Sequence, residues 1–139
     1  VPFLINDTTT RLAITKNAYE ILGDHLMGIQ IGNEPDLYQA HGHYTSYQPS
    51  DYFRDFGAYV QDMKNTNLPG TDLLVGPSIA YADWTTEEVW NTGFVSAYNE
   101  NLAFLTVEKY ISYLSSAVFY LFLPVLSAKL PNRQLCPPL

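Results

Sequence analysis

Hydrophobic positions in residues 1–110 alternate between two spacings. Apolar residues three and four positions apart predict three amphipathic helices, over 10–22, 50–64 and 85–98. Short apolar runs between them have the length of buried strands and cover 26–31, 73–76 and 102–107. Because strands separated by helices pair in parallel through right-handed crossovers, this order predicts an α/β fold.

Each predicted helix has one apolar face that is expected to be buried. On the first helix, this face consists of Ile14, Ala18, Ile21 and Leu22. On the second, it consists of Tyr52, Phe53, Phe56, Tyr59, Val60 and Met63. On the third, it consists of Val89, Trp90, Phe94, Ala97 and Tyr98.

Two architectures share this order of elements: an open doubly wound sheet and a piece of a (β/α)₈ barrel. A complete barrel needs about 250 residues, and the three predicted strands are less than half of its eight. Pro35 and Pro77 are expected to end the first and second strands, because proline cannot continue a central ladder.

The composition narrows the class of protein. Of the 139 residues, 47% are hydrophobic and 15% are charged, which excludes a wholly disordered chain. The 14 acidic and 7 basic residues give a net charge of −7, so no nucleic-acid partner is expected, because a phosphate binder needs a basic face. Cys136 is the single cysteine, which excludes an internal disulfide and a multi-cysteine metal site.

Residues 111–139 differ in composition from residues 1–110 and divide the chain into two parts. They contain no acidic residue, and residues 111–128 carry no charge at all before a Pro-rich end. The favoured interpretation is translated non-coding sequence. A membrane contact of residues 111–128 is the second interpretation, since about 20 apolar residues span a bilayer. A genuine divergent element is the third.

Candidate chemistry lies directly after the first predicted strand. In parallel α/β folds, ligands bind where the carboxyl ends of strands meet the following loops. Glu34 occupies such a position, between Asn33 and Pro35. Its carboxyl group could donate a proton, and the Asn33 amide could hold a hydroxyl group. Alternatively, the three residues form only a polar turn.

The loop after Glu34 is rich in tyrosine and histidine side chains. Tyr38, Tyr44 and Tyr47 could stack on sugar rings or pack within the loop. His41 and His43 form a His-x-His pair, but a metal site needs a third ligand and none has a suitable spacing. No metal is therefore expected.

A family resemblance is carried by residues 28–38, with the sequence GIQIGNEPDLY. This segment resembles the fourth-strand motif of the retaining glycoside hydrolases of the large (β/α)₈ clan. Its extension, Asp36-Leu37-Tyr38, is most similar to glycoside hydrolase family 79, the β-glucuronidases, in its fungal members. Three later segments resemble the following helix, the fifth strand and the sixth strand: 51–63, 74–78 and 105–110.

The resemblance implies that residues 1–110 are a fragment of a catalytic domain, a partial (β/α)₈ TIM barrel. It implies that Glu34 is the acid/base, which protonates the glycosidic oxygen and then deprotonates the incoming water. Asn33 would hold the sugar 2-OH, and Tyr38 and Tyr110 would contact the substrate. The implied partner is a carbohydrate, a β-glucuronide or a related glycoside, and no cofactor is implied.

A retaining enzyme also needs a carboxylate nucleophile, which in this clan ends the seventh strand. The chain stops matching after the sixth strand. Glu108, late on the third predicted strand, is a possible site residue but not this nucleophile. We therefore expect the chain alone to be inactive. The absence of an initiator methionine and of a signal-peptide layout is expected of a piece of a longer parent, and this parent is expected to be secreted.

Three alternatives remain at this point. The first is a non-catalytic sugar-binding remnant. The second is a hydrolase of the same clan with another specificity, such as an endo-β-glucuronidase of the heparanase type. The third is a membrane-tethered or aggregation-prone product, because an incomplete barrel has open strand edges.

Overall fold

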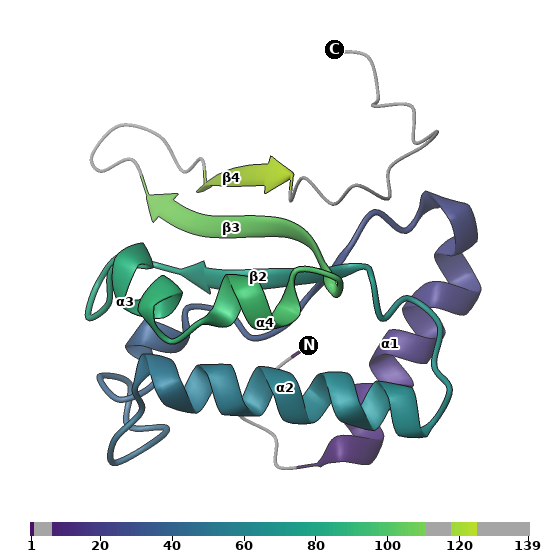
Figure 1. Cartoon of the computed structure of the whole chain (residues 1–139), viewed down its shortest axis with the longest axis horizontal. Helices are drawn as coiled ribbons and strands as arrows, with labels where there is room; N and C mark the ends of the chain where they lie inside the picture. Colours follow the sequence, from purple (N-terminus) through teal and green to yellow (C-terminus); the bar gives the residue numbers. More distant parts are fainter. Residues whose placement is uncertain (2–6, 111–117, 125–139) are drawn as a thin grey trace.

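A computed structural model describes the backbone of residues 1, 7–110 and 118–124, and the side chains of residues 1 and 7–108. Its centre is one sheet with the strand order β1-β2-β3-β4 (Figure 1). The strands are β1 (Ile29–Gln30), β2 (Leu74–Ile79), β3 (Leu102–Tyr110) and β4 (Val118–Pro124). The first three pair in parallel, which confirms the predicted α/β class and pairing.

Helices connect the parallel strands, as the sequence pattern predicts. α1 (Thr8–Leu22) and a short 3₁₀ helix, η1 (Gly23–His25), precede β1. A second 3₁₀ helix, η2 (Pro35–Leu37), and α2 (Pro49–Asn65) lie between β1 and β2. α3 (Thr86–Asn91) and α4 (Phe94–Tyr98) lie between β2 and β3. In Figure 1, the long helix α2 runs alongside the sheet, on the same side as α4.

α2 and α4 cover one face of the sheet at Gly76. A Cβ atom at this position would lie 2.5 Å from the Tyr52 hydroxyl, 3.5 Å from the Phe56 ring and 3.7 Å from the Phe94 ring. The Tyr52 hydroxyl also donates a hydrogen bond of 2.8 Å to the carbonyl of Ile31 and so ties α2 to the end of β1. The buried face predicted for α2 is confirmed at Tyr52, Phe56, Tyr59, Val60 and Met63.

The buried face predicted for α1 is wrong. Ile14, Ile21 and Leu22 are exposed, and Ile21 keeps 79% of its surface. α1 packs instead through Leu12, Thr15 and Tyr19. The physical reason is a polar contact, since the buried Thr15 hydroxyl hydrogen-bonds to the Tyr59 hydroxyl of α2. Hydrophobicity alone misplaces the face because the residue at its centre is a threonine.

The limits of the other elements also differ from the prediction. β2 does not end at Pro77 but runs to Ile79, and the register of its pairing with β3 shifts between Pro77 and Ile79. A shift of this kind tolerates proline because the ladder is interrupted there. The third predicted helix is two short helices, divided at Gly93, where φ is +83°. Trp90 is 36% exposed rather than buried in the core.

The described residues after β3 form a further strand. β4 pairs antiparallel with β3 over 104–110 and 118–124. Residues 111–117 and 125–139 lie outside the described residues, and with them most of the segment for which a membrane contact is considered. Among the helices that the structure does describe, none combines the length and the hydropathy needed to cross a bilayer.

Candidate functional site

Glu34 lies at the carboxyl end of β1, as the sequence predicts. Its backbone is left-handed, with φ +46° and ψ +54°, a conformation that non-glycine residues adopt at a cost of about 1–3 kcal/mol. Its amide donates a 3.0 Å hydrogen bond to the carbonyl of Ser78 on β2, which holds the strained turn in place. The side chain is half-buried, and its Oε1 atom is buried and has no hydrogen-bond partner among the described residues.

Asn33 and Tyr38 are neighbours in this turn but have different surroundings. The Asn33 side chain is exposed, and its Oδ1 atom accepts a 3.1 Å bond from the Gln30 amide. Tyr38 is only 3% exposed, and its hydroxyl accepts a 3.2 Å bond from the Asn33 backbone amide. Burial raises the pKa of Tyr38, so its hydroxyl stays protonated. Tyr38 therefore supports the Asn33 backbone.

Tyr110, the remaining residue assigned to substrate contact, is the last residue of β3. Its side chain lies outside the described part of the structure.

Asp36 is a structural member of the site that the sequence analysis did not single out. It is buried, and its two carboxylate oxygens accept bonds of 2.9 Å from the amide of Ala80 and 2.8 Å from the amide of Ala82. These bonds fix η2 to the segment that follows β2. The turn that carries Glu34 is therefore held at two points: the Glu34 amide bonds to Ser78 on β2, and Asp36 bonds to the segment directly after β2.

Glu108 is the second carboxyl group that the fold brings to this edge. It projects from β3 and is 1% exposed. Its Oε1 atom accepts a 3.1 Å bond from the amide of Gln30 on β1. Burial raises the pKa of Glu108, the bond from Gln30 lowers it in part, and the neighbouring Glu34 and Asp36 carboxylates raise it again. The arrangement is a half-buried glutamate after β1 and a buried glutamate on β3, two strands that are separated by β2.

Gln30 holds the parts of this edge together. Its single amide nitrogen lies within 3.1 Å of Asn33 Oδ1, 3.2 Å of the Gly32 carbonyl and 3.1 Å of Glu108 Oε1. Sequence reasoning passed over Gln30, although a usable signal was present: it is the one polar residue within the apolar run 26–31. A polar residue in such a strand needs a partner inside the fold.

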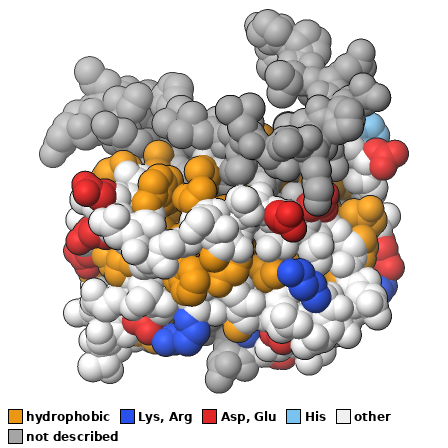
Figure 2. Space-filling model, viewed as in Figure 1, with side chains coloured by type: hydrophobic (Ala, Val, Ile, Leu, Met, Phe, Trp, Pro, Cys, Tyr) orange, Lys and Arg blue, Asp and Glu red, His pale blue; other side chains and the backbone are white. Residues whose placement is uncertain are grey.

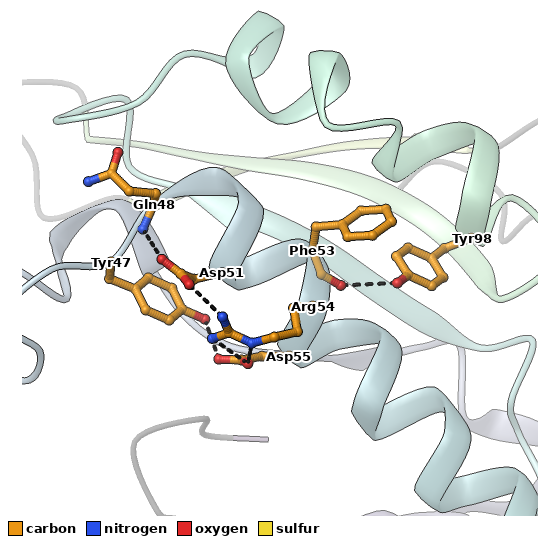
Figure 3. Close-up of polar contacts among 7 residues, drawn as sticks. All are labelled: Tyr47, Gln48, Asp51, Phe53, Arg54, Asp55 and Tyr98. Atoms are coloured by element: carbon orange, nitrogen blue, oxygen red, sulfur yellow. Dashed lines mark hydrogen bonds and ion pairs between the residues drawn. The ribbon is translucent and has the colours of Figure 1, made fainter.

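The aromatic loop after Glu34 is anchored to the start of α2. The Tyr47 hydroxyl donates a 3.0 Å bond to Asp55, and Arg54 bridges Asp55 and Asp51, as Figure 3 shows. The Tyr47 ring stacks on Trp84, with 5.9 Å between the ring centroids. Because Tyr47 and Trp84 are both buried, their rings form the base of the loop.

The exposed part of the same loop carries the two histidines. His41 and His43 are both exposed, with 6.1 Å between their ring centroids. Within the described residues, no group of three potential ligands is placed to hold a metal ion. Figure 2 shows acidic and basic side chains scattered over the described part of one face, without a patch of a single sign.

Comparison of the chain with protein-family models, with curated proteins and with solved structures finds no match. A half-buried carboxyl group, an exposed amide beside it and a second buried carboxyl group are suited to proton transfer onto a bound polar ligand.

Proposed function

We propose that residues 1–110 carry the acid/base half of a retaining, β-glucuronidase-like glycoside hydrolase. Glu34 protonates the glycosidic oxygen as the bond to the leaving group breaks, and later takes a proton from the attacking water. Asn33 holds the sugar hydroxyl next to the reacting carbon. A carboxylate nucleophile from outside the described residues completes the double displacement. The parent protein acts on a carbohydrate and is secreted.

One observation carries this proposal: the half-buried Glu34 carboxyl stands beside the exposed Asn33 amide at the carboxyl end of a parallel strand. The strand order supports it further. β1, β2 and β3 are sequential neighbours, and the helices of both crossovers contact Gly76 on one face. A partial (β/α)₈ barrel has this arrangement, as does one half of a doubly wound sheet.

The test is hydrolysis of an aryl β-glucuronide by the product of the full-length transcript. Sequencing that transcript across the Tyr110 codon shows whether a strand ending in glutamate follows. Glu34→Gln is expected to lower turnover by about 10²–10⁴-fold, because general acid–base catalysis contributes that much. Glu100→Gln, an exposed glutamate, is the matched control and should keep full turnover.

Sugar binding without hydrolysis is a second candidate, favoured by the exposed Asn33 side chain that Gln30 holds in place. It predicts that a methyl β-glucuronide binds in calorimetric titration and that neither the wild type nor Glu34→Gln turns over substrate. Wild-type turnover by Glu34→Gln would exclude the catalytic role. A protein that neither binds nor hydrolyses glucuronides would exclude both candidates.

A further inference from the structure

One atom of Gln30 contacts three groups at the edge of the sheet that carries Glu34. The amide nitrogen of Gln30 lies 3.2 Å from the Gly32 carbonyl oxygen, 3.1 Å from Asn33 Oδ1 and 3.1 Å from Glu108 Oε1. A backbone carbonyl oxygen can only accept a hydrogen bond. The Gly32 contact therefore requires Gln30 to turn its NH₂ group toward these neighbours, and the two hydrogens of this group are shared among three acceptors.

The orientation of Gln30 also decides the orientation of Asn33. Because the NH₂ group of Gln30 faces the Asn33 side chain, Asn33 meets it with its carbonyl oxygen, Oδ1. The NH₂ group of Asn33 is then at the opposite end of the amide, and no described residue accepts a hydrogen bond from it. Asn33 is held at its backbone as well, where its amide donates a 3.2 Å bond to the Tyr38 hydroxyl. The exposed Asn33 side chain is therefore fixed with its two N–H donors directed away from Gln30.

We propose that Gln30 is a positioning residue: it fixes the Asn33 amide with its NH₂ group toward the ligand, so that the position beside Glu34 selects a ligand atom that accepts a hydrogen bond. The oxygen of a sugar hydroxyl is such an atom. Gln30 acts on the ligand only through Asn33, and its contacts with Gly32 and Glu108 hold Gln30 in place. The choice of a sugar rests on the proposed function, whereas the orientation of Asn33 by Gln30 does not.

A double variant that exchanges the side chains at positions 30 and 108 separates this role from a structural one. Gln30→Glu with Glu108→Gln keeps both side-chain lengths and allows a hydrogen bond between the two positions, now donated from position 108. The carboxylate at position 30 has no donor, so Asn33 has to turn its NH₂ group toward position 30 and its oxygen toward the ligand. We expect the double variant to be more stable than Gln30→Glu alone, which places two carboxyl groups together without a donor between them.

The first readout is the exchange of the Asn33 side-chain NH₂ hydrogens with water, measured by ¹⁵N NMR on the 139-residue chain at neutral pH. In the double variant, this exchange should be slower than in the wild type by about two- to tenfold, the range that the net strength of one hydrogen bond gives. Gln61→Glu is the matched control: Gln61 donates a 2.8 Å bond to Asn65 Oδ1 on α2, and its substitution should leave the Asn33 signal unchanged. Unchanged Asn33 exchange in the folded double variant would overturn the proposal.

A measurement on the wild type covers the case in which the double variant does not fold. The NMR order parameter of the Asn33 side-chain amide should exceed that of Asn17, an exposed asparagine on α1. Equal order parameters would overturn the proposal, because Gln30 would then not restrain Asn33.

Ligand binding by the full-length product separates this inference from the proposed function. The two ligands are methyl β-glucuronide and its analogue in which fluorine, which can accept but not donate, replaces the hydroxyl next to the reacting carbon. In the double variant, the Asn33 oxygen faces the fluorine, so the affinity for the analogue relative to the parent should fall by about fivefold or more. A ratio that stays at its wild-type value would mean a merely structural role for Gln30 and would overturn the proposal. A turned Asn33 amide without binding of either glucuronide would support the role of Gln30 and contradict the proposed function.

Discussion

The two faces of the parallel sheet differ in chemistry, although the same three strands build both. Under α2 and α4, the sheet contacts the rings of Tyr52, Phe56 and Phe94 around Gly76. On the other face, Gln30, Thr106 and Glu108 are polar, and two of them bond to each other across the strands. Successive residues of a strand point to opposite faces, so one register places aromatic packing and polar groups only one residue apart.

The two faces therefore contribute differently: one to the stability of the fold, the other to the binding of protons. The helix-covered face buries apolar surface, which is the main favourable term in folding. The polar face holds groups that need hydrogen-bond partners inside the fold, and the Glu34 Oε1 atom has none among the described residues, which costs stability. Substitutions on the first face should therefore change unfolding, whereas substitutions on the second should change proton binding.

The largest expected effect comes from removing a large buried side chain from the helix-covered face. Phe56→Ala removes a fully buried ring that contacts Phe94, with 4.9 Å between the ring centroids. We expect the free energy of unfolding in urea to fall by about 3–5 kcal/mol. Trp90→Ala is the control, because Trp90 is half-exposed and should cost much less. Equal losses in the two variants would contradict the assignment of the core to this face.

A smaller effect is expected from adding a methyl group on the same face. Gly76→Ala places a Cβ atom 2.5 Å from the Tyr52 hydroxyl, which is itself bonded to Ile31. Overpacking of this kind costs about 1–3 kcal/mol in the free energy of unfolding.

Tyr52→Phe provides the matched background for this variant, because it removes the oxygen that the new methyl group would meet. In that background, Gly76→Ala should cost less. If a double-mutant cycle shows no coupling between positions 52 and 76, the new methyl group does not overlap with the Tyr52 hydroxyl.

The helix-covered face was also the part that the sequence could predict. The spacing of Tyr52, Phe56 and Met63 defines the buried side of α2 without knowledge of any partner. The α1 face was predicted wrongly because Thr15 is buried for its bond to Tyr59, a contact between residues 44 positions apart. Apolar periodicity carries no information about such polar pairs.

The residues of the candidate site also differ in whether the sequence could predict their contribution. Glu34 and Asn33 were predicted because a loop at a strand end is a local feature of the sequence. The contribution of Gln30 and Asp36 depends on β2 and β3, which pair with β1 only in the folded chain. The proximity of Glu108 to Glu34 depends likewise on the sheet order, which the pattern of elements leaves open.

Substitution of a titratable residue on the polar face should change the pH dependence of the free energy of unfolding rather than lower that free energy by a large amount. Since burial and the neighbouring carboxylates raise the pKa of Glu108, the folded chain keeps this proton at pH values where the unfolded chain has lost it. The resulting stabilisation is complete below the pKa of an unfolded glutamate, about 4.3, and is lost as pH rises through the folded value. Glu108→Gln stays neutral and should lack this loss.

The free energy of unfolding of Glu108→Gln minus that of the wild type should therefore rise with pH across this window. Other carboxyl groups act in the opposite direction, since hydrogen bonds to Thr85 lower the pKa of Glu88. Their contribution cancels in the difference between the two proteins, and Glu100→Gln is the control for the removal of an exposed glutamate. A flat or falling difference for Glu108→Gln would mean that folding does not raise the pKa of Glu108, and the two faces would then differ in polarity but not in proton binding.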